Sequence, residues 1–476
     1  MISPLLTDLY QLTMAYGYWK RDMHERLAVF QLIFRRNPFR GNFAVAAGLG
    51  SVIEFLNDWQ FQEDDLTYLS QLRGSNGDVL FPQAFLDYLK TLRFTGQIDA
   101  IPEGTVVFPQ EPLVRVTAPL IQGQLLESTL LNLINFQTLI ATKAARICRA
   151  AGRQDVLEFG LRRAQGPDGA LSASRAAYIG GCAGTSNVLA GKKYGIPVRG
   201  THAHSWVTAF PDELSAFMAY AEVMPHNCIL LVDTYDTIQG IKNAIQVGKK
   251  LRAKGGELQG IRLDSGDMVT LSRQARQLLD AAGFAETKII ASNSLDEYVI
   301  AEMKREKTDV SVWGVGTNLV TSYDHPALDG VYKLSALQNT EGVWEYKLKL
   351  SEQAAKISNP GIYQIKRFLK NNSPVMDIMY DTVLGFSSPA EMVSLDTPHA
   401  ITPVPDLDES IDLLRPIFVN GKCVYVSLSI HAIRTYCMQQ VDLFLQAYPT
   451  ALYPLGLDKK LHDLKLKLIL HYKLFR

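Results

Sequence analysis

The sequence has few cysteines, and none of them forms a Cys-x-x-Cys pair. Their number is odd, and they are scattered along the chain at Cys148, Cys182, Cys228, Cys423 and Cys437. This distribution argues against a disulfide framework and against a zinc site built on thiolates. We therefore expect a reducing compartment and a cytoplasmic protein.

An excess of charge of one sign is also missing, and so are long apolar runs. Lys plus Arg equals Asp plus Glu, at 48 each, so the chain has no overall electrostatic preference for nucleic acid or an anionic membrane. No stretch is apolar over the roughly 18 residues that a membrane helix needs, and residues 1–4 do not begin a signal peptide. We expect no nucleic-acid or membrane binding, and we expect any anion site to be a local cluster.

The chain has 476 residues, enough for two or three domains or for a barrel with a companion domain. Residues 27–34, 104–108 and 113–116 read as strands, and residues 125–150 have the apolar spacing of a long helix. We predict an N-terminal α+β domain (1–124), an α/β barrel carrying the active site (125–335), and a C-terminal segment (336–476) that completes the companion domain and ends in helices.

Short apolar strands alternate with helix-like segments in the middle of the chain, which favours βα units and a parallel sheet. Polar or glycine-rich residues follow each strand. In a parallel barrel all carboxyl ends of the strands open on one face, where active sites lie. A doubly wound sheet would also place ligands at strand ends, so the barrel is favoured and the alternative stays open. The predicted strands are residues 156–159, 196–198, 229–232, 260–263, 289–291 and 312–315.

Two of these strand ends carry residues suited to nucleophilic catalysis. An imidazole near its ordinary pKa of about 6.5 can act as a neutral nucleophile, and His204 is such a candidate, although a histidine beside a strand is more often structural. His202 would point the same way on an extended strand. Asp233 could orient an imidazole, or it could cap the helix that follows.

Arg262, Asp264 and Asp267 cluster at another strand end. A guanidinium fork suits a carboxylate or a phosphate, and carboxylates can hold ribose hydroxyls or Mg²⁺ through water. Asp267 could also cap the next helix, and the whole cluster could be a solvated loop with an internal ion pair. Residues 314–318 form a glycine turn whose backbone N–H groups could cradle a phosphate, although Gly-x-Gly alone is weak evidence.

Four of these segments, taken in order, closely resemble the nicotinate phosphoribosyltransferase family. They are residues 6–11, 158–165, 200–205 and 262–267, and the resemblance runs from Leu6 to about Leu464. It implies the fold of the type II phosphoribosyltransferases, an irregular parallel α/β barrel with an α+β companion domain. It also implies a homodimer with shared active sites, in which the N-terminal segment with Tyr10 reaches the site of the other subunit.

The resemblance implies a ligase-type enzyme of NAD biosynthesis. Such an enzyme transfers the phosphoribosyl group of phosphoribosyl pyrophosphate to nicotinate, giving nicotinate mononucleotide and pyrophosphate, the first step from nicotinate to NAD. ATP hydrolysis is coupled through a phosphohistidine, and Mg²⁺ is required. The family pattern places the nucleophile directly before a serine, which selects His204 and leaves His202 unassigned; Asp233 would orient it.

Roles in substrate binding are likewise implied by the resemblance. Tyr10 and Phe159 would sandwich the pyridine ring, and Arg162, rather than Arg163, would bind the nicotinate carboxylate or the nucleotide phosphate. The remaining assignments place Arg262 near the base, Asp264 near the ribose, Gly314, Gly316 and Thr317 in a phosphate loop, and Asp267 at the metal.

Three rival functions are weighed against this one. A nicotinamide phosphoribosyltransferase resembles this chain but has an acidic residue against the amide, and residues 183–187 contain no carboxylate. A barrel aldolase or lyase would want a Schiff-base lysine or a metal cage, and no lysine stands at the six strand ends. A non-catalytic binding protein is the third.

Residues 457–476 read as an amphipathic packing helix, with a membrane-surface helix as the alternative.

Overall fold

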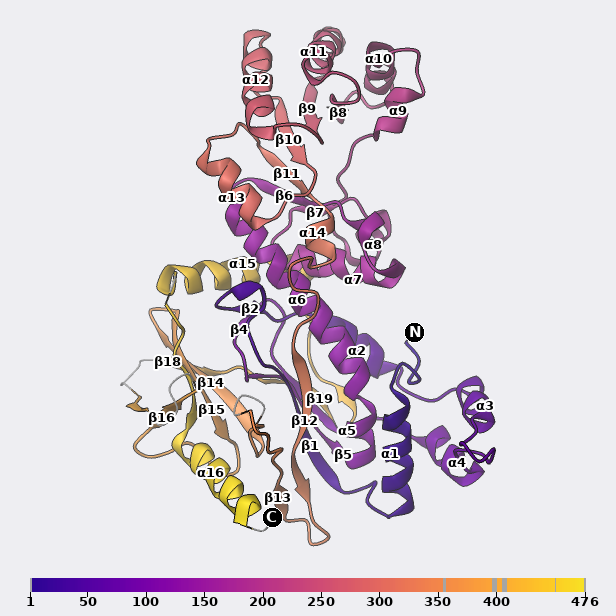
Figure 1. Ribbon diagram of the computed structural model, residues 1–476, viewed down its shortest axis with the longest axis vertical. Coiled ribbons are helices and arrows are strands. Elements are labelled where there is room, and N and C mark those ends of the chain that lie inside the picture. Colours follow the sequence, from indigo (N-terminus) through magenta and orange to yellow (C-terminus); the bar gives the residue numbers. More distant parts are fainter. Residues whose placement is uncertain (1, 354–356, 396–399, 405–408, 450, 475–476) are drawn as a thin grey trace. The chain divides into compact units, whose positions relative to one another are not determined.

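A computed structural model describes residues 2–353, 357–395, 400–404, 409–449 and 451–474 (Figure 1). The chain forms two compact units. The companion unit comprises Met1–Leu139, Ala327–Ser429 and Gln439–Arg476, and the barrel unit comprises Ile140–Pro326 and Ile430–Met438. The domain boundaries expected at residues 124 and 335 stay a prediction.

The companion unit is built first around a seven-stranded sheet, counted over the described residues. Its inner strand β1 (Leu27–Phe34) pairs antiparallel with β5 (Pro112–Pro119) and β12 (Gly330–Gln338). Because every residue of β1 after Leu27 is buried, this strand is apolar on both faces. The predicted strand 27–34 is therefore confirmed. The sheet order is β13 (Trp344–Tyr346), β12, β1, β5, β3 (Gln97–Ala100), β19 (Arg415–Val419) and β20 (Lys422–Cys423).

A second sheet of this unit has six described strands and contains a buried ion pair. Arg367 of β14 (Tyr363–Lys370) faces Asp377 of β15 (Ser373–Asp381) across the hairpin, with Nε 2.9 Å from Oδ1. Tyr453 donates to the same carboxylate. The other strands are β16 (Glu391–Ser394), β17 (Ile401–Pro403), β18 (Glu409–Asp412) and β21 (Leu455–Asp458), and β2 (Ala44–Val45) pairs with β4 (Val106–Val107) separately.

The amphipathic C-terminal segment forms α16 (Lys459–Leu474), which packs against β15, β16 and β21. Leu461 is fully buried there, and Lys465 donates to Asn359, so the packing-helix interpretation holds for the described residues. The other helices of this unit are α1 (Leu9–Lys20), α2 (Leu49–Asn57), α3 (Glu63–Gln71), α4 (Gln83–Thr91), α5 (Leu120–Leu125) and the short turn Pro38–Arg40.

The barrel unit contains six parallel strands among the described residues, in the order β7-β6-β11-β10-β9-β8. Five of the six predicted strands are found, whereas residues 196–198 form only an isolated bridge between Val198 and Thr185. β7 is two residues long and escaped prediction. The bounds are β6 (Asp155–Glu158), β7 (Gly184–Thr185), β8 (Cys228–Leu231), β9 (Leu258–Leu263), β10 (Lys288–Ser292) and β11 (Val312–Val315). The irregular parallel α/β barrel with an α+β companion is thereby confirmed.

Helices connect these strands (Figure 1). Apolar residues of α10, α11 and α12 pack against the sheet. The long helix predicted at residues 125–150 is α6 (Glu127–Ala151). Leu230 of β8 and Ile261 of β9 belong to one buried cluster with residues of α10, α11 and α12. The remaining helices are α7 (Gly166–Ile179), α8 (Val188–Tyr194), α9 (His204–Thr208), α10 (Glu213–Val223), α11 (Thr237–Ala253), α12 (Met268–Ala281), α13 (Glu297–Arg305), α14 (Thr317–Val320), α15 (Ile430–Ala447) and the turn Leu161–Arg163.

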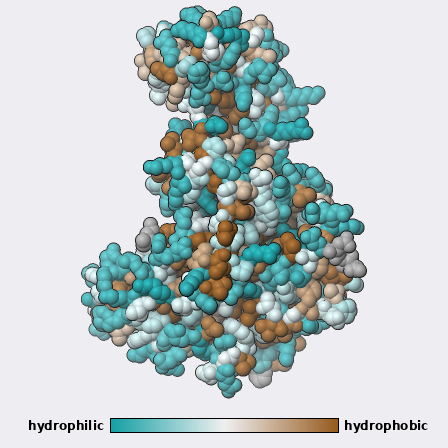
Figure 2. Space-filling model, turned by 180° about the vertical axis from the view of Figure 1, so that it is seen from behind, coloured by the Kyte–Doolittle hydropathy of each residue, from teal (hydrophilic) through white to brown (hydrophobic). Residues whose placement is uncertain are grey.

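The surface carries its exposed apolar side chains in small groups. On the face shown in Figure 2 these groups are separated by hydrophilic residues. Within the described residues, no helix is both long and apolar enough to cross a bilayer. The five cysteines are free thiols, as their spacing predicts.

Candidate active site

One edge of the parallel sheet collects the predicted site residues of the barrel unit. Because β6, β8, β9, β10 and β11 run parallel, the residues that follow them meet at the same end of the strands. This edge holds Phe159 after β6, Asp233 after β8, Asp264 after β9, Asn293 after β10 and Gly316 after β11.

The ring of Phe159 lies so close to strand β11 that only glycine fits beneath it, at position 314. Its N–H donates to the carbonyl of Val315, and a Cβ placed on Gly314 would come within 2.7 Å of the ring. A Cβ on Gly160 would come within 2.3 Å of Val320. The glycines therefore serve close packing around Phe159 and the first turn of the following segment.

Arg262 is fixed in front of Phe159 by two partners. Its Nε donates to Ser292 Oγ at 2.8 Å, and Nη2 donates to Asp264 Oδ1 at 2.9 Å. The guanidinium carbon stands 5.7 Å from the centroid of the Phe159 ring, within cation–π range. Both groups line a cavity of about 280 Å³, whose walls also include Leu157, Val198, Arg199, Gly200, Thr201, Asn227, Ile229 and Ile290. An apolar wall with a cation suits a small planar anion.

His204 stands beside two carboxylates. Its Nε2 is 3.8 Å from Asp233 Oδ1 and 3.9 Å from Asp264 Oδ2, and its Nδ1 is 3.1 Å from the Thr234 hydroxyl. The His204 side chain is 44% exposed, whereas that of Asp233 is 1% exposed. The histidine is therefore open to an incoming group while its acidic neighbour is held in place.

Asp233 is bonded on one oxygen and unpaired on the other. Its Oδ2 accepts from the backbone N–H of Asp264 and from the Ser265 hydroxyl. Its Oδ1 is buried and accepts no hydrogen bond within the described part of the chain, although it is the oxygen nearest His204. The helix that follows is capped by Asp236, not by Asp233. The capping alternative for Asp233 is therefore wrong, and the geometry leaves an acceptor for an imidazole N–H.

His202 is a structural residue that helps to close the barrel. Its Nε2 accepts from the backbone N–H of Leu231 in β8, and the Thr201 hydroxyl donates to the carbonyl of Ile229. These side chains join the segment after Val198 to β8. The imidazole is 8% exposed, and this burial lowers the pKa of His202 from 6.5 to about 4. His202 is therefore neutral near pH 7, and its Nε2 is engaged with the backbone of β8, so it does not share the role predicted for His204.

Acid is expected to destabilise the protein through His202. Because the folded pKa lies below the unfolded one, the unfolded chain binds the proton more tightly, and stability is lost as pH falls from 6.5 toward 4. Between pH 7 and pH 5 this loss amounts to about 2 kcal/mol. In His202→Gln, which keeps an acceptor for Leu231, the unfolding midpoint should change less between these two pH values. Equal changes in the variant and the wild type would contradict the assignment.

Asp267 caps helix α12, which is the alternative to metal binding that the sequence left open. Both of its oxygens accept hydrogen bonds from the first turn of α12, from Val269 and Thr270. These bonds lower the pKa of the Asp267 carboxyl, the Thr270 hydroxyl contributing most. In the described residues, no group of three or more His, Cys, Asp or Glu side chains is arranged to hold a metal ion.

Thr185, in the stretch of residues 183–187, donates a hydrogen bond to a carboxylate from the neighbouring strand, that of Glu158. This contact was not predicted from the sequence. Glu158, the residue before Phe159, is 1% exposed and accepts from the Ser174 and Thr185 hydroxyls and from the backbone N–H of Gly160. Its oxygens are thus occupied by the protein itself. A sequence signal existed, because successive strand residues point to opposite faces, so Glu158 had to point away from Phe159.

The other predicted residues lie at the surface. Arg162 and Arg163 are both exposed in the turn after Phe159, and nothing in their placement separates them. Thr317 begins α14 directly after Gly316. Tyr10 lies on α1 in the companion unit and is 50% exposed. Thr234 and Ser292 were not predicted as site residues. The structure shows Thr234 as a partner of His204 and Ser292 as a partner of Arg262.

Two family models match this chain. Residues 5–135 match the nicotinate phosphoribosyltransferase (NAPRTase) N-terminal domain, and residues 155–371 match the nicotinate phosphoribosyltransferase (NAPRTase) family. The chain belongs to the nicotinate phosphoribosyltransferase family. The resemblance drawn from the four motifs is confirmed, and membership of this family also removes the aldolase and lyase alternatives.

Relatives within the nicotinate phosphoribosyltransferase family cover most of the chain. The enzyme so named from Bacillus subtilis is 46% identical over 370 residues, spanning 78% of this chain and 74% of its own length. That from Dictyostelium discoideum is 38% identical and spans 97% of this chain and 87% of its own length. The crystal structure of human nicotinic acid phosphoribosyltransferase matches with a TM-score of 0.85 at 31% identity, covering 97% of this chain and 99% of that one.

Proposed function

We propose that this protein transfers the phosphoribosyl group of phosphoribosyl pyrophosphate to nicotinate, forming nicotinate mononucleotide and pyrophosphate, as the first step from nicotinate to NAD. The observation that carries the proposal is the cavity in which Arg262 faces Phe159. Asp264, the partner of Arg262, places its Oδ2 3.9 Å from His204 Nε2. In this cavity the aromatic face receives the pyridine ring, and the guanidinium receives the carboxylate. The free thiols support the expected cytoplasmic location.

The transfer itself requires alignment more than proton transfer. The pyridine nitrogen attacks C1 of the ribose as the C1–O bond to pyrophosphate breaks, and the pyrophosphate leaves with the bonding electrons. Asp264, held by Arg262 and Ser292, is placed to bind ribose hydroxyls. The turn with Gly316 and Thr317 at the start of α14 offers backbone N–H groups to the 5′-phosphate, whereas Gly314 belongs to β11 and packs against Phe159. Holding the reacting atoms in line supplies most of the acceleration.

We propose that ATP phosphorylates His204 at Nδ1. Asp233 Oδ1, which is buried and unpaired, lies 3.8 Å from Nε2 and is the acceptor for an Nε2–H. That tautomer places a lone pair on Nδ1, which is 3.1 Å from the Thr234 hydroxyl. When this contact opens, Nδ1 attacks the γ-phosphorus, and ADP leaves as the P–O bond breaks. The added negative charge then lies next to the pyrophosphate and couples ATP hydrolysis to the transfer, which is the basis for a ligase-type classification.

The residues at this edge suit Mg²⁺ held mainly by substrate phosphates. Mg²⁺ usually keeps several waters and takes one or two protein carboxylates. Asp264, whose side chain is 30% exposed, supplies such oxygens, whereas those of Asp267 are already engaged in capping and Asp233 Oδ1 is the acceptor for the imidazole of His204. We therefore assign Mg²⁺ to Asp264 in place of Asp267. When bound, the ion would neutralise charge on the phosphate oxygens.

The enzyme should work as a homodimer with shared sites. Phe159 provides one face for the pyridine ring, and Tyr10, which is 50% exposed on α1, provides the other from the second subunit. Arg162 is exposed beside Phe159 and is available to a carboxylate or phosphate of the ligand.

Substrate choice is the first test of this proposal. With nicotinate the kcat/KM should exceed that with nicotinamide by about 10- to 150-fold, because a hydrogen bond to a charged group contributes about 1.5–3 kcal/mol. Arg262 supplies the cation, and Glu158 is buried and fully bonded, so Glu158 does not favour the amide. Each substrate is assayed with phosphoribosyl pyrophosphate, with and without ATP. Equal kcat/KM values would contradict the proposal.

The control for this assay is a matched arginine pair. Arg262→Met should lower the kcat/KM for nicotinate more than that for nicotinamide. Arg252→Met, which breaks the exposed pair between Arg252 and Glu257 on the same unit, should leave both unchanged. A loss of nicotinate preference in Arg252→Met would show that the preference does not come from Arg262.

A further inference from the structure

Two loops of the barrel unit follow β10 and β11, at residues 293–296 and 316–326. Asn318 links the two loops, because its side-chain amide donates to the carbonyl of Ser294 at 3.1 Å and to that of Leu295 at 3.3 Å. The second loop continues the glycine turn assigned above to the 5′-phosphate. A change in the spacing of the two loops would therefore move the backbone N–H groups of this turn.

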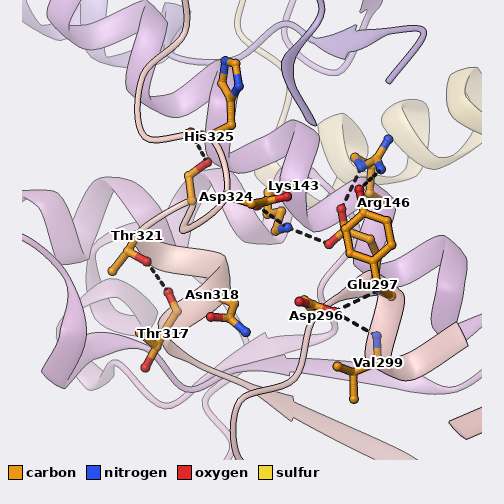
Figure 3. A network of polar contacts seen from close by, with 12 residues as sticks. Lys143, Arg146, Asp296, Glu297, Val299, Thr317, Asn318, Thr321, Asp324 and His325 are labelled. Atoms are coloured by element: carbon orange, nitrogen blue, oxygen red, sulfur yellow. Dashed lines mark hydrogen bonds and ion pairs between the residues drawn. The ribbon is translucent and has the colours of Figure 1, made fainter. Parts of the chain in front are cut away.

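A buried lysine of α6 forms a second link between the same two loops (Figure 3). Lys143 of α6 places its Nζ 2.7 Å from Glu297 Oε2 at the start of α13, and 2.7 Å from Asp324 Oδ1 in the second loop. The Lys143 side chain is 1% exposed, and that of Glu297 is 7% exposed. One cation therefore bridges two segments that are separate in sequence.

The charges in this cluster are balanced. Arg146, one turn further along α6, donates from Nε to Glu297 Oε1 at 2.8 Å and from Nη2 to the Tyr298 hydroxyl at 3.3 Å. Glu297 thus meets a cation at each oxygen, while Lys143 alone reaches Asp324 among the ion pairs of the described residues. A buried ion pair is often no more stabilising than an apolar packing of similar volume, so its value here is the geometry that it imposes.

Each loop is also ordered internally, and these internal bonds differ from the links that Asn318 and Lys143 make between the loops. Asp296 caps α13 by accepting from the N–H groups of Tyr298 and Val299, and Thr321 donates to the carbonyl of Thr317 (Figure 3). In the second loop the Ser322 hydroxyl donates to the carbonyl of His325. These bonds lie within single segments and do not set the distance between the loops.

We propose that Lys143 is a positioning residue that holds the loops after β10 and β11 at the separation required by the phosphate of the ribosyl substrate. The inference rests on the proposed function. Removal of Lys143 leaves Glu297 paired with Arg146 but releases Asp324, so the loop at residues 316–326 should move while α13 stays anchored.

The test compares Lys143→Met and Lys143→Arg with a buried ion-pair variant of the companion unit, Arg367→Met. We expect Lys143→Met to raise the KM for phosphoribosyl pyrophosphate by about 10- to 100-fold, since misplacement by about 1 Å can have such an effect. The KM for nicotinate and the kcat should change by less than about threefold, and Lys143→Arg should restore part of the loss. Amide hydrogen exchange should become faster in residues 316–326.

The Arg367→Met control removes a buried cation from Asp377 and should lower the melting temperature without changing either KM. An unchanged KM for phosphoribosyl pyrophosphate in Lys143→Met would overturn the inference, as would an equal rise in the KM of both substrates or the same rise in Arg367→Met. If the wild type turns over neither substrate, the proposed function fails. Hydrogen exchange then decides: faster exchange at residues 316–326 in Lys143→Met, but not in Arg367→Met, supports the link, and unchanged exchange overturns it.

Discussion

Replacing His204 by alanine is expected to abolish phosphorylation of the protein by ATP. Incubation of the wild type with γ-labelled ATP and Mg²⁺ should give a phosphoenzyme that is labile in acid and stable in base, as a phosphoramidate is. The reason is the environment of His204, with an unpaired carboxylate oxygen 3.8 Å from Nε2 and a side chain 44% exposed. In His204→Ala the label should fall to background, and ATP should no longer stimulate the transfer.

His202 provides the matched control for this experiment. It lies two residues away but is buried, and it accepts from Leu231. His202→Gln should therefore retain the label as long as the variant is folded, which circular dichroism would establish. Label that survives the loss of His204 would mean that another residue is the nucleophile.

A mixture of two inactive variants is expected to regain activity. In Tyr10→Ala and in His204→Ala homodimers, both sites of the dimer carry a defect. If Tyr10 enters the site of the other subunit, a mixed dimer collects both defects in one site and leaves the other intact. Random exchange makes half of the dimers mixed, so activity should recover to about a quarter of the wild-type value.

The control is a mixture in which both variants affect residues of the barrel unit, such as Arg262→Met with His204→Ala. In mixed dimers of these variants each site still has one defect, so activity should stay low. Subunit exchange is verified with differently tagged chains. Recovery in both mixtures, or in neither, would show that Tyr10 does not act across the dimer.

Strands with enough apolar residues to be buried on both faces could be predicted from the sequence. β1 and the five longer barrel strands are of this kind, because their apolar runs end at glycine or polar residues. β7 could not be found, since a two-residue strand has no periodicity. Residues 196–198 read as a strand but form one bridge, because the barrel is joined there by the side chains of Thr201 and His202.

The candidate site shows the same division. Residues at or just after the carboxyl ends of apolar strands, such as Phe159, Asp233 and Arg262, could be placed at the sheet edge from chain order alone. Their partners could not, because Ser292 reaches Arg262 from the neighbouring strand and Thr234 approaches His204 only in three dimensions. Asp267 also showed the limit, since a carboxylate before a helix reads alike as a ligand and as a cap.

Asp233 bonds through Oδ2 to the loop of Asp264 and Ser265 while its Oδ1 faces His204. The imidazole of His204 and the carboxylate of Asp264 are therefore not independent parts. Residues that share a partner show free-energy effects that do not sum, so the separate effects of substitutions at His204 and Asp264 will not add up to that of the double variant. Any exchange of one of these loops between relatives would have to carry the other with it.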